Sequence, residues 1–153
     1  MAYWLLIVAA GLLIAFLVWW LIFESEGVYL GQRVVIWLYD LYARRYDGLK
    51  DVDLVAEHLL LAQPILARLP HTDPLVLDVA TGTGRLPLAL CHHARFEGFV
   101  IGMDMSLGML GVAADKLRDE HFLDYVMLAR ADAGRLPFPD NSVDLVTCLE
   151  ALE

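Results

Sequence analysis

The sequence predicts an α/β protein with a doubly wound parallel sheet, preceded by an apolar N-terminal helix. From Leu75 onward, short apolar runs of strand length alternate with segments of helical periodicity, a pattern typical of parallel sheets with helical crossovers. The first of these runs leads into a turn that contains two glycines. Separately, the segment Tyr3–Phe23 contains no charged residue.

The N-terminal segment Tyr3–Phe23 is predicted to be a transmembrane helix. At about 1.5 Å rise per residue, it spans roughly the 30 Å hydrocarbon thickness of a bilayer. Tyrosine and tryptophan lie near both ends, as in an aromatic belt. A cleaved signal peptide is disfavoured because no basic residue precedes the run and bulky residues stand where cleavage needs small ones. A buried core helix is disfavoured because the segment is apolar on every face.

Basic residues follow this segment but do not precede it, the first being Arg33, Arg44 and Arg45. The positive-inside tendency therefore predicts a single-pass membrane protein whose C-terminal part is cytoplasmic. We accordingly divide the chain into an anchor (1–26), a helical connector that covers a ligand (27–73) and a partial α/β domain (74–153).

The composition limits the classes of molecule that the chain is expected to bind. The net charge of −9 argues against a nucleic-acid surface, because phosphate binding needs a basic patch and the arginines are scattered. Cys91 and Cys148 lie in apolar segments and give neither a disulfide framework nor the spacing of a metal site. A small or lipid-like substrate fits this composition better.

The connector is predicted to be helical. In residues 28–46, Val34, Trp37, Leu38, Leu41 and Arg45 follow helical spacing, so this helix lies either at a membrane interface or against the domain. A second helix is expected over Asp51–Leu69, with a kink or a new turn at Pro64.

The α/β domain follows a turn at residues 70–74. Strands are expected at Leu75–Val79, Phe99–Met103, Tyr125–Ala129 and Val143–Leu149. Helices are expected at Arg85–Ala94 and Ser106–Arg118, with Ser106 as the N-cap.

The residues after the first strand indicate a cofactor site. Gly82 and Gly84 lack a Cβ, so the turn can be sharp and the main chain can lie against a ligand. The dinucleotide fingerprint has a third glycine where this chain has Pro87. Asp78 would repel a cofactor with two phosphates and attract one with an ammonium group. The pattern thus favours S-adenosylmethionine over a dinucleotide.

Two further strands are also followed by acids. Asp104 can accept hydrogen bonds from both hydroxyls of a ribose, and Asp132 can accept one from an adenine amino group. Because the carboxyl ends of parallel strands meet at one edge of the sheet, we expect both to surround one ligand together with Asp78.

Together these segments closely resemble the class I S-adenosylmethionine-dependent methyltransferases, in particular the methyltransferase type 11 group that includes the ubiquinone and menaquinone C-methyltransferases. The resemblance covers roughly residues 42–152 and implies a Rossmann-like sheet. It also implies the cofactor-binding residues, which are Asp78, Ala80, Thr81, Gly82, Gly84, Asp104, Met105, Asp132, Ala133, Cys148, Leu149 and, in the connector, Tyr46.

The family resemblance implies seven strands, whereas the chain supplies four, so we expect an incomplete sheet and a C-terminally truncated chain. The leading hypothesis is a membrane-anchored methyltransferase for a small or lipid-like acceptor. The alternative is a non-catalytic, membrane-tethered fragment that binds the cofactor, and a nucleotide-dependent oxidoreductase is third. No catalytic base is assigned, because packing, turns and helix ends account for the histidines, which are His58, His71, His92, His93 and His121. The acceptor atom and the oligomeric state stay open.

Overall fold

The computed structural model describes residues 2–20, 31–49, 58–69 and 71–149. The chain divides into two compact units, Met1–Leu38 and Tyr39–Glu153. This division falls inside the predicted connector, and the three predicted domain ranges stay predictions.

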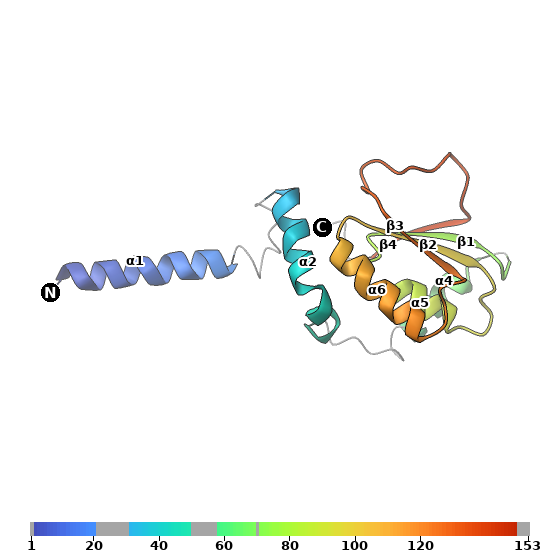
Figure 1. The fold of residues 1–153 in the computed structure, drawn as a ribbon, viewed down its shortest axis with the longest axis horizontal. Helices are drawn as coiled ribbons and strands as arrows, with labels where there is room; N and C mark the ends of the chain where they lie inside the picture. The colour runs from blue at the N-terminus through green and yellow to red at the C-terminus, as the bar shows by residue number, and fades with distance from the viewer. Residues whose placement is uncertain (1, 21–30, 50–57, 70, 150–153) are drawn as a thin grey trace. The chain divides into compact units, whose positions relative to one another are not determined.

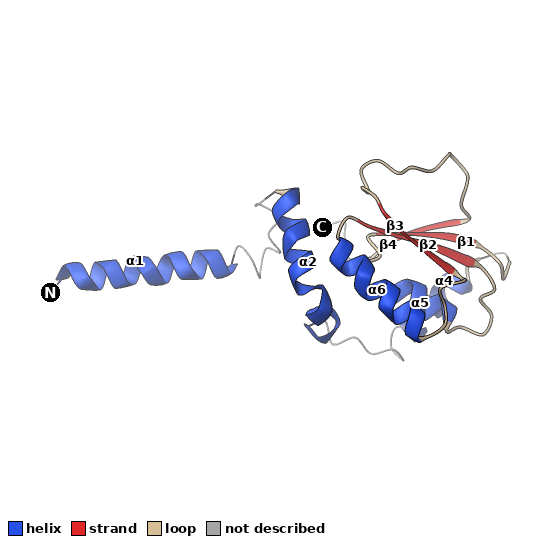
Figure 2. Cartoon of the chain, in the orientation of Figure 1, coloured by secondary structure: helices blue, strands red, loops and turns tan. Residues whose placement is uncertain are grey.

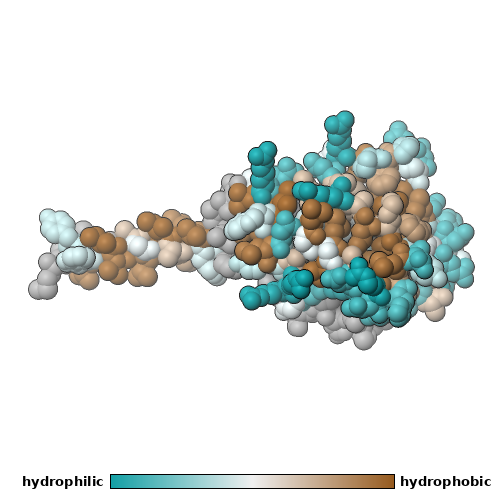
Figure 3. Space-filling view, viewed as in Figure 1, coloured by the Kyte–Doolittle hydropathy of each residue, from teal (hydrophilic) through white to brown (hydrophobic). Residues whose placement is uncertain are grey.

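The first unit contains helix α1 (Ala2–Trp19) and the beginning of helix α2 (Gln32–Leu49). Apolar side chains make up much of the face of α1 that Figure 3 shows, and Leu12 and Ile14 are 68% and 61% exposed. Within the described residues, no helix has both the length and the apolar character needed to cross a membrane.

The predicted transmembrane helix Tyr3–Phe23 is therefore not supported. In this part of the chain the structure describes a regular α-helix over Ala2–Trp19. Residues 21–23 of the predicted span lie outside the described part of the chain.

The second unit is built on a parallel sheet, as predicted (Figures 1 and 2). Its four strands lie in the order β3-β2-β1-β4. Their bounds are β1 (Leu75–Val79), β2 (Phe99–Asp104), β3 (Val126–Arg130) and β4 (Leu145–Cys148). The chain adds β2 and β3 on one side of β1 and then returns to place β4 on the other side. Ligands of doubly wound sheets bind at the carboxyl ends of the strands where the order reverses, which here is beside β1.

Helices cover one face of this sheet (Figure 2). They are α5 (Arg85–Cys91), α6 (Leu107–Asp119) and the short α4 (Gln63–Leu66), which follows the π-helix η3 (His58–Ala62). Their buried side chains, such as Leu90 and Leu117, form one core with Val76 and Val100 of the sheet. The other face buries a smaller cluster around Leu77, Val79, Ile101 and Met103.

The predicted element boundaries are mostly confirmed within one or two residues. Strand β1 and the N-cap at Ser106 match the prediction. Helix α5 ends at Cys91, earlier than predicted, because His92 caps it and the His93 N–H bonds back to Leu90. Helix α4 has a proline in its first turn, Pro64, as expected, whereas residues 51–57 of the predicted helix lie outside the described part.

Candidate cofactor site

A left-handed turn connects β1 to α5. Gly82 and Gly84 have φ of +55° and +79°, and Ala80 between β1 and the turn also has a positive φ of +57°. The Thr81 N–H donates to the Met103 carbonyl at 2.9 Å, which ties the turn to β2. The turn is therefore fixed to the sheet at the edge where the strand order reverses.

The two glycines of this turn serve different needs. A Cβ on Gly84 would come within 3.0 Å of the Cβ of Ala113, so this glycine lets the start of α5 lie close to α6. A Cβ on Gly82 would meet none of the described residues within 4 Å. The main chain at Gly82 therefore faces open space, where a ligand can approach it.

Asp104 at the end of β2 joins two loops of the site. One carboxylate oxygen, Oδ2, accepts from the Gly82 N–H at 2.9 Å. The other, Oδ1, accepts from the Ser106 N–H at 2.8 Å. Since each carboxylate oxygen has more than one acceptor position, both can still accept from the hydroxyls of a ribose.

Asp78 is a buried acid at the same edge. The residue is 2% exposed, and its carboxylate accepts a hydrogen bond from the Thr147 hydroxyl at 2.8 Å. Burial raises the pKa of Asp78 to about 6, and the nearby negative charge of Asp104 adds to this rise, whereas the hydroxyls of Thr81 and Thr147 oppose it. A positive ligand charge beside Asp78 would favour its ionised form.

Thr81 carries a polar atom whose bonding is incomplete. It lies near enough to lower the pKa of Asp78, but its buried hydroxyl oxygen makes no hydrogen bond of acceptable geometry with the described residues. Gly102 of β2 makes room for it, because a Cβ there would lie 3.0 Å from the Thr81 hydroxyl oxygen. Buried polar groups in native proteins are nearly always paired, so a polar ligand group fits here. Sequence reasoning missed Gly102, although a glycine inside a strand was the available signal.

The third predicted acid is placed differently. The end of β3 lies beside β2, since the Ala131 N–H donates to the Asp104 carbonyl at 3.1 Å. The exposed Asp132, however, turns a carboxylate oxygen to the N–H of Gly134 in its own turn, at 2.9 Å. The structure thus brings Asp78 and Asp104 together, and the adenine-binding role of Asp132 stays a prediction.

The remaining predicted positions lie around this edge of the sheet. Met105 is half-buried after β2, and Ala133 is exposed beside Asp132. Cys148 ends β4, and burial together with the charge of Asp78 raises the pKa of its thiol, so it stays protonated. Leu149 after it is 37% exposed. Their contact with a cofactor stays a prediction.

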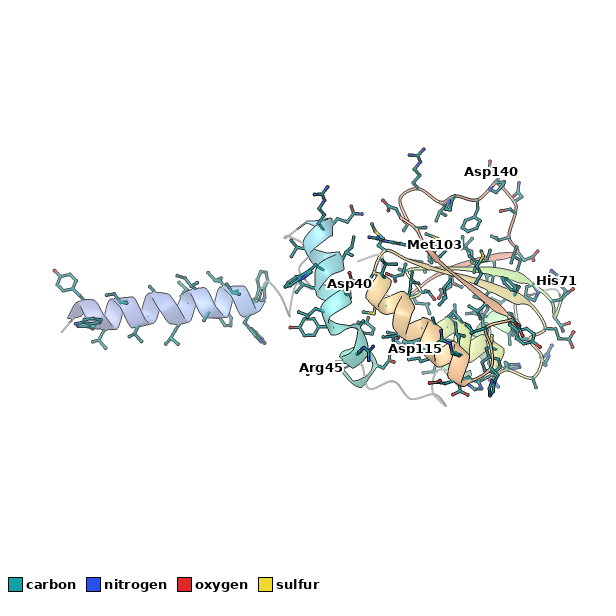
Figure 4. All side chains as sticks on the ribbon, viewed as in Figure 1. Asp40, Arg45, His71, Met103, Asp115 and Asp140 are labelled. Atoms are coloured by element: carbon teal, nitrogen blue, oxygen red, sulfur yellow. The ribbon has the colours of Figure 1, made fainter. Side chains whose placement is uncertain are left out.

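The histidines with described contacts serve local structure. His71 lies 3.2 Å from Asp73 and 3.6 Å from Asp144, before the start of β1, and Figure 4 places it at the opposite end of the unit from Asp40. His92 lies at the C-terminal end of α5 and stacks edge-on against Phe122 with ring centroids 5.0 Å apart. Neither is placed to act at the carboxyl ends of β1 and β2.

Helix α2 supplies contacts that the sequence analysis missed. Asp40 accepts from the Ser106 hydroxyl at 2.5 Å and from the Gly108 N–H at 2.8 Å. Asp47 accepts from the Thr83 hydroxyl at 2.5 Å. The predicted Tyr46 is half-buried and lies edge-on to Tyr39 at 6.2 Å between ring centroids.

A family model described as "Methyltransferase domain" matches residues 76–153. This range contains β2, β3, β4 and all of β1 except Leu75, together with the site residues from Asp78 to Leu149 but not those of α2. The chain belongs to the methyltransferase domain family. The class I S-adenosylmethionine-dependent methyltransferase fold expected from the sequence is thereby confirmed.

The names of curated relatives of this methyltransferase domain describe methyltransferases of menaquinone and ubiquinone biosynthesis. The chain is 37% identical over 111 residues to a demethylmenaquinone methyltransferase of Lactiplantibacillus plantarum, covering 72% of this chain and 47% of the relative. It is 43% identical over 117 residues to a ubiquinone/menaquinone biosynthesis C-methyltransferase of Idiomarina loihiensis, covering 76% and 47%. The chain therefore spans about half the length of these relatives.

The fold is also found in solved methyltransferase structures. A putative S-adenosylmethionine-dependent methyltransferase of Methanococcus maripaludis superposes with a TM-score of 0.65 at 21% identity, covering 73% of this chain and 50% of that one. At this identity the likeness shows the fold alone.

The residues of this methyltransferase domain fit S-adenosylmethionine. Asp104 offers acceptors for a ribose diol, and Gly82 leaves its main chain open. Thr81 has a buried hydroxyl that makes no hydrogen bond of acceptable geometry with the described residues. Asp78 adds a buried acid that a positive ligand charge would stabilise in its ionised form.

Proposed function

We propose that this methyltransferase domain transfers a methyl group from S-adenosylmethionine to a small, lipophilic, quinone-like acceptor. The choice of cofactor rests on one observation. The Gly82 N–H donates a hydrogen bond to Asp104 at the carboxyl ends of the strands, where the strand order reverses. The acceptor class is supported by the printed names of the curated relatives, of which the chain spans about half.

Each residue of the site has a definite task in this proposal. Asp104 would bind the ribose, and the main chain at Gly82 would lie against the cofactor. Asp78 would hold its positively charged methionine end. When bound, the cofactor supplies an electrophilic methyl group on a sulfonium. The protein contributes alignment of the acceptor and exclusion of water, so a fixed turn and fixed acids are what the chemistry requires.

The test combines binding and turnover on the full chain. Calorimetric titration with S-adenosylmethionine should show one site, whereas NADH should not bind. A demethylated naphthoquinol should then accept a radiolabelled methyl group. Binding of NADH in place of S-adenosylmethionine would contradict the proposal and favour a nucleotide-dependent oxidoreductase.

A second candidate is a cofactor-binding fragment without catalysis. Two apolar side chains on the sheet face opposite the helices, Met127 and Val146, are 46% and 52% exposed, whereas parallel sheets usually bury both faces. Tight binding of S-adenosylmethionine without methyl transfer to any quinol tested would favour this candidate.

We also propose that the N-terminal part associates with a membrane and leaves the domain on the cytoplasmic side. The exposed apolar side chains of α1 support this proposal, as does α2, which exposes Trp37 (59%) and Leu41 (60%) together with Arg44 and Arg45. Flotation of the full chain with anionic vesicles tests membrane association. A chain that stays at the bottom of the gradient contradicts it.

A further inference from the structure

We infer that Asp40 and Asp47 of α2 are positioning residues of the cofactor site. Both accept hydrogen bonds from residues in the two loops that this site uses, although neither acid lies at the end of a strand. The effect on cofactor binding rests on the proposed function, whereas the hydrogen bonds themselves are present in the folded chain without a cofactor.

Asp40 acts on the loop that carries Asp104. One oxygen of Asp40 accepts from the hydroxyl of Ser106, whose own N–H donates to Asp104. The same oxygen of Asp40 accepts from the Gly108 N–H in the first turn of α6, so its negative charge also lies at the positive end of that helix. Figure 4 shows Asp40 extending from α2 toward α6.

The fit at this contact is close. A Cβ on Gly108 would lie 2.7 Å from the Cα of Asp40 and 2.9 Å from its carbonyl oxygen. At this point the main chain of α2 therefore lies directly against the main chain of α6, and Gly108 permits this approach because it has no Cβ. A small movement of α2 would change the Ser106 contact directly.

Asp47 acts on the glycine turn. It accepts from the hydroxyl of Thr83, which lies between Gly82 and Gly84 and is 1% exposed. Asp47 also forms an ion pair with Lys116 of α6, and the Lys116 ammonium donates to the Thr83 carbonyl at 3.2 Å. Two residues outside the turn thus hold Thr83, Asp47 through its hydroxyl and Lys116 through its carbonyl.

The two acids act together because they share one face of one helix. Asp40, the buried Ala43 and Asp47 follow the spacing i, i+3 and i+7, which puts them on the same side. Asp40 reaches Asp104 through Ser106, and Asp104 in turn accepts from Gly82 in the turn that Asp47 holds. The helix therefore fixes the distance between the ribose-binding acid and the glycine turn.

Hydrogen–deuterium exchange on the full chain without cofactor tests the positioning directly. Asp40→Ala loses two hydrogen bonds to a carboxylate and should speed exchange in residues 104–109. Asp47→Ala loses one such bond and an ion pair and should speed exchange in residues 81–84. Each increase should be at least about tenfold. Asp115→Ala is the matched control, because Asp115 pairs with Arg118 on the exposed surface of α6, away from the two loops of the site. Unchanged exchange in both segments would overturn the inference.

Binding of S-adenosylhomocysteine gives the second readout. Asp40→Ala should raise the dissociation constant about tenfold in the wild-type background and by less than about twofold when Asp104 is already alanine, because Asp40 acts through that residue. Asp40→Asn, which keeps an acceptor oxygen, should restore most of the affinity. Equal effects in both backgrounds would show a merely structural role. If the wild-type chain does not bind while exchange responds as expected, the proposed function fails and the positioning stands.

Discussion

The carboxylate of Asp104 accepts a hydrogen bond from the main-chain N–H of Gly82 at 2.9 Å, which joins the end of β2 to the turn after β1. Its second oxygen accepts from the Ser106 N–H at 2.8 Å. One side chain thus sets the position of both loops that surround the proposed ribose.

Replacement of this acid should damage binding more than folding. Asp104→Asn leaves one of the two N–H groups without an acceptor, so we expect the free energy of unfolding to fall by about 1–3 kcal/mol. The dissociation constant for S-adenosylmethionine should rise at least tenfold. Urea unfolding and calorimetry measure the two effects, and an unchanged dissociation constant would exclude Asp104 from the site.

The two glycines of the turn should respond differently to alanine. Gly84→Ala brings a Cβ within 3.0 Å of Ala113 at a φ of +79°, so it should destabilise the fold by about 1–3 kcal/mol. The Cβ of Gly82→Ala meets no atom of the described part of the chain within 4 Å, so this change should cost only about 1 kcal/mol for its positive φ. It should nevertheless weaken cofactor binding strongly, because its Cβ occupies the open space. Equal affinity in wild type and Gly82→Ala would argue against a ligand there.

Gly102 should be intolerant of any side chain. A Cβ there lies 3.0 Å from both Leu128 and the Thr81 hydroxyl oxygen, so Gly102→Ala should lower the free energy of unfolding by about 1–3 kcal/mol. Gly111→Ala in α6 is the matched control, because no described residue outside its own helix turn lies within 4 Å of the added Cβ, and it should stabilise the helix by about 0.5–1 kcal/mol. Denaturant midpoints of the two variants should therefore move in opposite directions.

Asp78 should make stability fall as the pH rises from about 4 to about 6. Its pKa is raised from 3.8 to about 6 in the folded chain, so in this range the folded state binds more protons than the unfolded state. The contribution of Asp78 to the free energy of unfolding is fully present below pH 4 and is lost as the pH rises through 6. Unfolding of wild type and Asp78→Asn should be compared at pH 4.5, 5.5 and 7. A difference between the two chains that does not change with pH would contradict the raised pKa.

The sequence predicted those parts of the site that local rules determine. Strand β1, the N-cap Ser106 and the acids Asp78 and Asp104 follow from apolar runs, capping chemistry and the position of residues after strands. Asp40 was missed because its partner Ser106 lies 66 residues away, and no local pattern reveals a contact of that kind. The membrane-spanning helix was predicted from hydropathy, but none of the described helices is long and apolar enough to cross a membrane. The orientation of Asp132 depends on its own turn, which spacing does not specify.

Photochemical cross-linking of radiolabelled S-adenosylmethionine to the full chain, followed by peptide mapping, tests the central claim most directly. We expect label in the segments 78–84 and 104–106, and loss of that label when unlabelled S-adenosylhomocysteine is added. Competed label confined to other segments, or no competed label at all, would contradict it.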